Sequence, residues 1–203
     1  MDSHYIKAEG LSKTYGKRSI IAGIDVYAAP NRPAAIVGPN GSGKTTLLEI
    51  LCGIRRPTTG SITFMRNGTA VEHHTTHSIG FVSPRLRLYD ELTAEETIRF
   101  AAQTDEAIAR GMEFLAHFGL SQYKKLFINR YSTGMLQRLK IIIALMNDPL
   151  AIFLDEPTTN LDEEGKKLVF ELLRTFIAKK IIVIATNDPE EASLCSRRIS
   201  LGK

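Results

Sequence analysis

The 203-residue sequence has no tryptophan, only two cysteines and no long apolar run. A helix that spans a membrane needs about 20 predominantly apolar residues, so we expect no transmembrane segment. The opening residues, Met-Asp-Ser-His, do not form the basic and then apolar pattern of a secretory signal. We expect Cys52 and Cys195 to be core thiols rather than a disulfide, as is usual in a reducing compartment. These absences predict a cytoplasmic protein.

The chain also has little excess charge of either sign. Its net charge is +4, and the lysines and arginines are scattered rather than clustered. This is typical of a solvated surface, and we expect no nucleic acid partner. Attraction to an anionic membrane face stays open, since a suitably placed cation contributes about 1 kcal/mol there. The length favours a single domain over residues 1–203, large enough to bury about 70% of the surface that the unfolded chain exposes.

A glycine-rich segment with the pattern Gly-x4-Gly-Lys-Thr lies between an apolar, strand-like stretch and a helix-like one. Its residues are Gly38, Pro39, Asn40, Gly41, Ser42, Gly43, Lys44, Thr45 and Thr46. Glycines let the backbone curl so that several N–H groups converge on phosphate oxygens, and the following helix presents its positive end. We expect Lys44 to contact the β- and γ-phosphates and Thr45 to place its hydroxyl on Mg²⁺. The alternative, a glycine-rich turn with a surface lysine, does not explain the flanking strand and helix.

A second candidate site follows the short apolar run at residues 151–154. Asp155 and Glu156 end this run, as expected of a buried parallel strand whose tip meets a ligand crevice. We expect Asp155 to hold Mg²⁺ through water and Glu156 to orient or deprotonate the attacking water. Two acids can also simply mark the end of a strand. Beside a phosphate loop, the functional interpretation is favoured.

Strand and helix patterns alternate along the chain. We expect strands at 5–11, 20–27, 34–37, 61–65, 78–82, 151–155, 181–185 and 199–201. A turn is expected at 57–60, and Asn67-Gly68 is a hairpin signal. Between 88 and about 135 the pattern becomes helical: Thr93 and Glu96 form a capping box, and a second helix is expected to stop at Gly119. The alternation predicts an α/β protein with a helical insert.

The motifs, in their order, resemble those of the ATP-binding subunit of an ABC transporter. They are an aromatic in Leu-Ser-Lys-Thr-Tyr15-Gly, the phosphate loop, the helical insert, Tyr131-Ser-Thr-Gly-Met-Leu-Gln-Arg138, the acidic strand, and Pro157-Thr-Thr-Asn-Leu-Asp162. The resemblance covers essentially the whole chain. The short length and the ending at 197–201 are more weakly similar to the ATPase of the haem exporter used in cytochrome c biogenesis.

The resemblance implies a fold and a set of partners. The fold is a P-loop NTPase core with a mainly parallel sheet, an N-terminal antiparallel β-subdomain and the helical subdomain inserted at about 88–135. The cofactors are ATP and Mg²⁺. The partners are membrane-spanning transporter subunits and a second ATPase subunit, either identical or related, so the protein is expected at the inner face of the cell membrane.

The resemblance also assigns roles to single residues outside the phosphate loop. Tyr15 is expected to stack on adenine, although a strand-end tyrosine in the core is an alternative. Ser132 and Gly134 are expected to reach the γ-phosphate bound to the opposite subunit, and Ser132 as a plain helix N-cap is the alternative. Asp162 is expected to contact the partner subunit across the ATP sandwich. A simple N-cap explains Asp162 equally well.

The chain departs from the family pattern at three places. They are Tyr131, Thr133 and Met135 in the signature Leu-Ser-Gly-Gly-Gln, Pro84 where the family has glutamine, and Asn187 where it has histidine. Proline has no amide for Mg²⁺ or water, so Pro84 leaves that role empty or hands it to Ser83. Asn187 can hydrogen-bond a γ-phosphate but cannot carry a positive charge or relay a proton. We therefore expect intact nucleotide binding and impaired hydrolysis.

The histidines at 73, 74 and 77 are close enough in sequence to suggest a metal site. They stand in a polar segment with no cysteine nearby, so an exposed loop is favoured. The function expected from the whole sequence is ATP binding at a shared dimer interface, with hydrolysis that drives transport through separate membrane subunits. The alternative is a weakly hydrolysing or non-transport ATPase of the same superfamily that acts as a nucleotide-controlled clamp.

Overall fold

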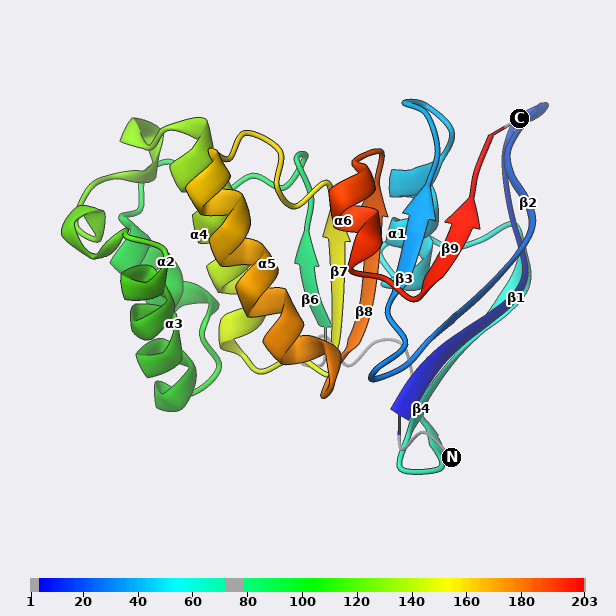
Figure 1. Cartoon of the computed structure of the whole chain (residues 1–203), viewed down its shortest axis with the longest axis horizontal. Helices are drawn as coiled ribbons and strands as arrows, with labels where there is room; N and C mark the ends of the chain where they lie inside the picture. The colour runs from blue at the N-terminus through cyan, green and yellow to red at the C-terminus, as the bar shows by residue number, and fades with distance from the viewer. Residues whose placement is uncertain (1–3, 72–78, 203) are drawn as a thin grey trace.

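The computed structural model describes residues 4–71 and 79–202, which form two β-sheets with helices around them (Figure 1). The strands are β1 (His4–Tyr15), β2 (Arg18–Ala28), β3 (Ala34–Val37), β4 (Thr59–Arg66), β5 (Thr69–Val71), β6 (Ile79–Val82), β7 (Ala151–Asp155), β8 (Ile181–Thr186) and β9 (Arg197–Ser200). The helices are α1 (Lys44–Leu51), α2 (Ala94–Ala101), α3 (Asp105–His117), α4 (Thr133–Met146), α5 (Glu163–Ile177) and α6 (Pro189–Ser193).

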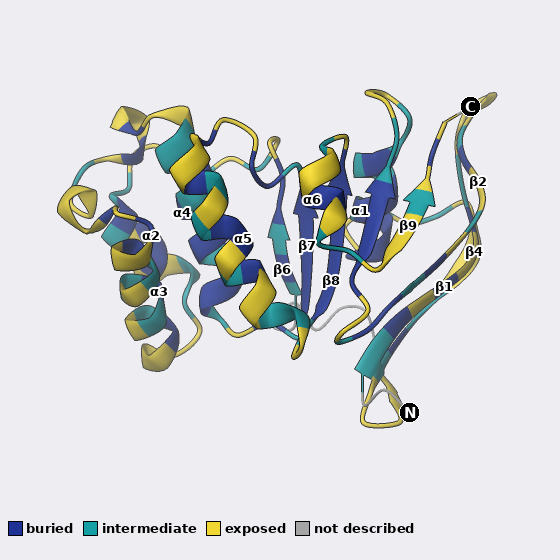
Figure 2. Ribbon diagram, viewed as in Figure 1, coloured by how far each residue is buried: buried dark blue, intermediate teal, exposed yellow. Residues whose placement is uncertain are grey.

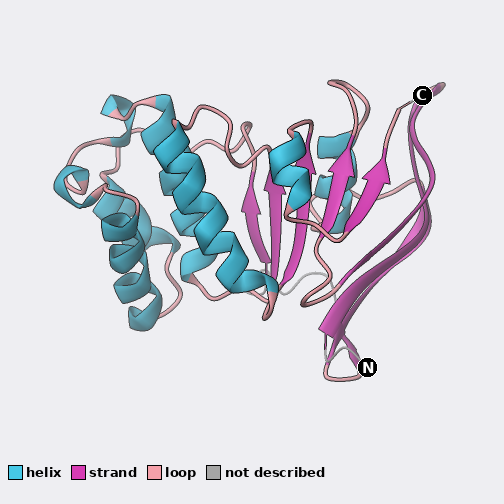
Figure 3. Ribbon diagram, in the orientation of Figure 1, coloured by secondary structure: helices cyan, strands magenta, loops and turns pink. Residues whose placement is uncertain are grey.

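The larger sheet is parallel and carries the phosphate loop. Its five strands have the order β6-β7-β8-β3-β9, and each neighbouring pair is parallel. Figure 3 shows helices on both of its faces, with α5 and α6 toward the viewer and α1 behind β3. A sheet covered on both sides needs continuous apolar strands rather than alternating ones. Figure 2 shows this for β7 and β8, every residue of which is buried.

The smaller sheet is antiparallel and lies on the far side of β9 from the parallel strands, at the right of Figure 1. Its strand order is β2-β1-β4-β5. The predicted hairpin is confirmed: Asn67 and Gly68 connect β4 to β5 and have positive φ angles of 51° and 80°. The predicted turn at 57–60 is too long by two residues, because Thr59 and Gly60 already belong to β4, where Thr59 pairs with Ser12 of β1.

The helical segment forms the opposite end of the molecule, at the left of Figure 1. Its capping box is confirmed, since Thr93 accepts from the Glu96 amide and the Glu96 side chain accepts from the Thr93 amide. Helix α3 ends at His117, and after the cap residue Phe118 the chain turns at Gly119 with φ 68°, so the predicted stop at this glycine is confirmed. The fold class is thus confirmed: an α/β P-loop NTPase core, an antiparallel β-sheet near the N-terminus and inserted helices.

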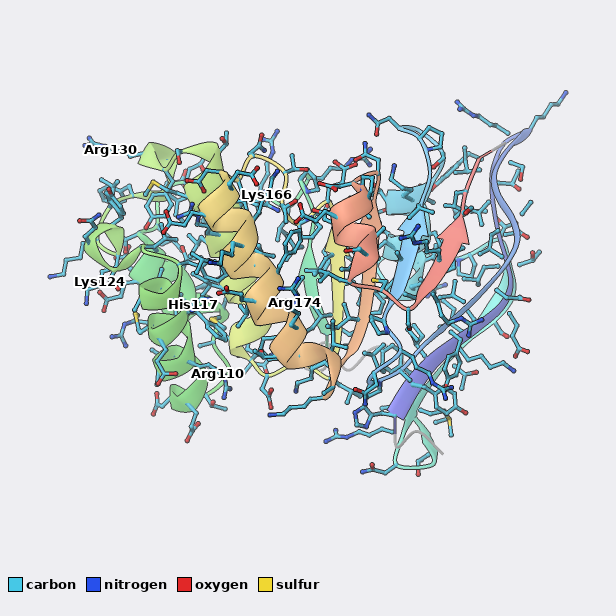
Figure 4. All side chains as sticks on the ribbon, in the orientation of Figure 1. Arg110, His117, Lys124, Arg130, Lys166 and Arg174 are labelled. Atoms are coloured by element: carbon cyan, nitrogen blue, oxygen red, sulfur yellow. The ribbon has the colours of Figure 1, made fainter. Side chains whose placement is uncertain are left out.

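The remaining expectations concern cysteine, histidine and surface charge. Cys52 is buried and Cys195 half-buried, both are free thiols, and burial raises the pKa of Cys52 to about 11. The histidines at 73, 74 and 77 lie outside the described residues. Figure 4 labels several basic side chains on the helical end of the molecule, and they project from separate elements, α3, α5 and the turns before α4. The scattered surface charge stays a prediction.

Candidate functional site

The phosphate loop connects the carboxyl end of β3 to the N-terminus of α1, at the top of Figure 1. Gly43 caps the helix in a left-handed conformation with φ 102°, and a Cβ there would lie only 2.9 Å from Cγ2 of Ile20. A Cβ on Gly38 would lie 2.2 Å from the Leu201 carbonyl oxygen. Only glycine fits at either position. The backbone therefore forms a tight cradle of the kind that holds phosphate.

Lys44 is held inside this loop rather than extended into solvent. Its Nζ donates to the carbonyl oxygens of Gly38 at 2.7 Å and Pro39 at 3.2 Å, and the residue is only 6% exposed. An ammonium group has three donors and no acceptor, so neutral carbonyls satisfy its hydrogens without neutralising its charge. The alternative of a surface lysine in a simple turn is wrong.

The two predicted metal ligands meet directly. Thr45 donates from Oγ1 to Oδ2 of Asp155 at 2.9 Å, and Ser83 donates from Oγ to the same oxygen at 3.2 Å. Burial is the largest influence on Asp155 and raises the pKa of its carboxyl group, while the bonds from Thr45 and Ser83 act in the opposite direction. Clustered oxygen donors, one of them an acid in a low-dielectric position, fit a hard cation such as Mg²⁺.

This pair is smaller than an all-protein metal cage. Among residues 4–71 and 79–202, no group of three or more histidine, cysteine, aspartate or glutamate side chains is placed to hold a metal ion. Magnesium commonly takes only one or two protein ligands and completes its shell with water and substrate phosphate oxygens. Thr45 and Asp155 therefore fit a metal that arrives with a nucleotide.

Glu156 is adjacent to Asp155 but directs its side chain elsewhere. Its φ of 48° is left-handed, and its amide donates to the carbonyl of Ala185 on β8 at 2.8 Å. Such a conformation is uncommon for glutamate and needs support from its surroundings. The side chain lines a cleft of about 380 Å³ together with Lys44 and Thr45. A carboxylate thus faces the space next to the phosphate loop, where a base for water is needed.

Tyr15 lines the same cleft. It is 45% exposed, so the alternative of a core tyrosine is wrong. Arg55 donates to its hydroxyl at 2.5 Å, and the Lys13 ammonium lies 5.1 Å from the ring centroid. These contacts hold an aromatic ring at the surface of the cleft, as a stacking platform for a base requires.

Ser132 and Asp162, which the resemblance assigns to the contact with a second subunit, each lie at the N-terminus of a helix. Ser132 caps α4 by accepting from the Met135 amide at 3.2 Å, and Asp162 caps α5 by accepting from the Gly165 amide at 3.0 Å. Both cap alternatives are therefore observed. Gly134 lies on the first turn of α4, where a Cβ would come within 2.9 Å of the Asn160 carbonyl. The signature helix and the loop before Asp162 are thus packed closely together.

A second cleft, of about 310 Å³, lies on the other side of Glu156 and includes Asn187. Asn187 donates from Nδ2 to Oδ1 of Asn40 at 3.2 Å. Beneath it, Glu191 is 2% exposed and accepts from the amide and the hydroxyl of Thr158 at 2.8 and 2.6 Å. Burial raises the pKa of the Glu191 carboxyl group. This buried carboxylate fixes the loop that follows Glu156.

Several residues at the site were missed by sequence reasoning. They are Arg18, Arg85, Gln137 and Glu191. The sequence names Ser83 only as a residue that could take over the role of the glutamine missing at Pro84. In the structure Ser83 is 1% exposed and contacts Asp155 directly. A polar residue straight after the apolar strand β6, beside β7 in a parallel sheet, is the signal that could have placed Ser83 at the metal ligand.

Comparisons with known proteins agree with this geometry. A family profile described as "ABC transporter" matches residues 21–159. The chain is 34% identical to the lipoprotein-releasing system ATP-binding protein LolD of Cytophaga hutchinsonii, over 96% of this chain and 94% of that protein. It is 31% identical to the daunorubicin resistance ATP-binding protein DrrA3 of Streptomyces coeruleorubidus, over 97% of this chain but only 64% of the length of that relative.

Solved structures are similar as well. The dimeric structure of a bacterial ABC transporter cassette superposes with a TM-score of 0.84 at 28% identity, covering 97% of this chain and 94% of that one. A post-hydrolysis state of the same cassette, bound to ADP and Pi, gives a TM-score of 0.83. Within the part of the chain that the structure describes, each helix is too short or too polar to cross a membrane.

Proposed function

Because the chain belongs to the ABC transporter family and is one of its ATP-binding ATPase subunits, we propose that the cleft beside the phosphate loop binds Mg-ATP and hydrolyses it. One observation carries the proposal. Thr45, the last residue of the Gly-Lys-Thr motif, is hydrogen-bonded to the buried Asp155 at 2.9 Å, although 110 residues separate them in sequence. The metal ligand of the loop and the acid of the strand therefore meet at one point.

Each part of the nucleotide is assigned to its own set of residues. Tyr15 stacks on the adenine, and the amides of residues 38–46 donate to the phosphates. Lys44 exchanges its carbonyl contacts for phosphate oxygens, which is favourable because a charged donor then meets a charged acceptor. Thr45 and Asp155 hold the magnesium ion, which when bound neutralises charge on the phosphates.

Hydrolysis is assigned to Glu156 and to residues of a second subunit. Glu156 orients or deprotonates the attacking water, since it lines the cleft together with Thr45. A second subunit, identical or related, completes the site through its Ser132 and Gly134 at a helix N-terminus, where backbone N–H groups favour anions. Asp162 contacts that subunit across the sandwich.

We also propose that residues 1–203 form a single ATP-binding domain and that its helical subdomain docks membrane-spanning subunits at the inner face of the cell membrane. Supporting this is a groove of about 270 Å³ beside α4, whose lining combines leucines such as Leu86 and Leu136 with the charged residues Arg87, Asp90 and Lys140. Next to it, Tyr89 and Phe100 are 60% and 68% exposed and pack edge to face with ring centroids 5.4 Å apart. Exposed aromatics beside a groove of mixed polarity are typical of a protein interface.

The uncharged Asn187 favours a second candidate function. A subunit that binds ATP well and hydrolyses it slowly would act as a nucleotide-controlled clamp. The narrower resemblance to a haem-exporter ATPase stays a prediction without support, because the relatives described above are named for lipoprotein release and daunorubicin resistance.

Phosphate release tests the proposal. The wild-type protein should release phosphate from ATP when Mg²⁺ is present. This release should stop when EDTA is added. Glu156→Gln should abolish release, whereas Glu171→Gln, on the exposed side of α5, should not change it. Release that persists in Glu156→Gln would contradict the assignment of the base, and full activity in EDTA would contradict the magnesium site.

A further inference from the structure

Two arginines, Arg18 and Arg85, line the nucleotide cleft, and they come from different parts of the fold. Arg18 pairs with Tyr15 across the β1–β2 hairpin, so it is at the end assigned to adenine. Arg85 belongs to the loop after β6. In the parallel ladder Val82 pairs with Leu154, so this loop emerges beside Asp155 and Glu156. Arg85 is therefore at the end assigned to the terminal phosphate and the metal.

Hydrogen bonds tie Arg85 to the metal site. Its amide donates to Oγ of Ser83 at 3.3 Å, and that oxygen donates in turn to Oδ2 of Asp155 at 3.2 Å. The Leu86 amide donates to the Ser83 carbonyl at 3.1 Å, which closes a four-residue turn with Pro84 at its second position and Arg85 at its third. Proline is favoured there because its φ is already fixed for the turn. Pro84 thus fixes the turn that places Arg85 beside the proposed phosphate site.

The phosphate end of the cleft needs a cation that is free to move toward its ligand. Lys44 is assigned to the phosphates through the loop itself, and on the other flank of Glu156, Asn187 is neutral and bonded to Asn40. Arg85 is exposed, and within residues 4–71 and 79–202 it forms no ion pair. Guanidinium keeps its charge at all relevant pH values and donates two parallel bonds to a phosphate.

We propose that Arg85 contacts the γ-phosphate of ATP bound in the same chain and stabilises the charge that develops there during hydrolysis. The assignment rests on the proposed function of the cleft. It gives Arg85 the role of the positive group that Asn187 cannot fill. It also predicts that Arg85 distinguishes ATP from ADP, which lacks the terminal phosphate, whereas Arg18 does not.

Calorimetric titration with Mg-ATP and with Mg-ADP tests this, using Arg85→Ala, Arg85→Lys and Arg18→Ala. We expect Arg85→Ala to weaken ATP about tenfold and ADP less than twofold, because one charge-assisted contact is lost only for ATP. Its kcat should fall about tenfold or more. Arg85→Lys, which keeps the charge, should retain most of the preference for ATP. Arg18→Ala, the matched variant at the other end of the cleft, should leave the ratio of the two Kd values unchanged.

The outcomes separate this inference from the function on which it rests. If the wild type binds both nucleotides but Arg85→Ala leaves the ratio of their Kd values unchanged, the Arg85 assignment is wrong and the ATP site stands. If Arg18→Ala shifts the ratio of the Kd values as much as Arg85→Ala does, the Arg85 assignment is wrong as well. If the wild type binds neither nucleotide, both the site and the Arg85 assignment fail.

Discussion

Asn187 donates a hydrogen bond to Asn40 across the entrance of the site, at 3.2 Å between Nδ2 and Oδ1. The contact joins the loop after β8 to the phosphate loop, 147 residues away in sequence. Both side chains are neutral amides, so the link fixes geometry without adding charge. If Asn187 faces the phosphates, as we propose, it is a group that can donate a hydrogen bond but cannot stabilise a developing negative charge as a cation would.

Asn187→His should raise the steady-state hydrolysis rate at least several-fold. Removing a preorganised transition-state contact typically costs about 10² to 10³ in rate, so restoring one should recover part of that range. ATP affinity should change little, because the imidazole acts on charge that develops in the transition state. Phosphate-release kinetics and calorimetry measure the two quantities. Asn187→Ala is the control, since it also frees Asn40 but adds no imidazole. A brisk wild-type rate that falls on introducing histidine would mean that Asn187 is an adapted contact.

Glu156→Gln should shift the protein from monomer toward dimer when ATP is present. The substitution removes the base but keeps every phosphate contact, so bound ATP persists and continues to bridge two subunits. Size-exclusion chromatography with ATP, and with ADP as the control, reports the change. If the variant stays monomeric alone but dimerises with a related ATPase, the partner is that relative. If it dimerises with neither, the shared site is wrong.

Asp155→Asn should stabilise the nucleotide-free protein at pH 7 while abolishing magnesium-dependent hydrolysis. Asp155 is 4% exposed, and burial raises the pKa of its carboxyl group above the ordinary value of 3.8. A charge buried in this way lowers stability at neutral pH, and asparagine can still accept the bonds from Thr45 and Ser83. A gain of about 1 kcal/mol would raise the midpoint of thermal unfolding by about 2–4 °C.

The pH dependence of this gain has a definite sign. A raised native pKa means that the folded protein binds the proton more tightly than the unfolded chain does. The penalty from the ionised Asp155 therefore decreases as the pH falls from neutral toward 3.8, and the deficit of the wild type relative to Asp155→Asn should shrink and then vanish below that value. Thermal unfolding between pH 7 and pH 3.5 measures the difference. A variant that is less stable at pH 7 would contradict the burial argument.

Local motifs predicted much of the site, because their chemistry is contained in a few consecutive residues. The phosphate loop, the capping box at Thr93 and the hairpin at Asn67 each follow from neighbouring side chains and backbone preferences. Contacts between distant segments could not be predicted in the same way. Ser83 reaches Asp155 across 72 residues and Glu191 reaches Thr158 across 33, and both depend on the order of strands in the sheet.

Pro84 shows how a single-residue comparison can mislead. Compared with the family pattern, it is a lost amide, and the sequence predicts either an empty position or a transfer of the role to Ser83. In the fold it occupies the second position of a turn whose third residue, Arg85, lines the nucleotide cleft. The meaning of the substitution therefore lies in the neighbour that it positions, which no single position reveals.

Calorimetric titration of the Lys44→Ala variant with Mg-ATP tests the central claim, that this cleft binds ATP through its phosphate loop. The Lys44 ammonium group donates its hydrogen bonds to loop carbonyls, so its loss should remove the positive charge that meets the phosphates without unfolding the domain. We predict saturable binding for the wild type, no measurable binding for Lys44→Ala, and identical far-ultraviolet circular dichroism for the two proteins. Unaltered ATP affinity in Lys44→Ala would contradict the account.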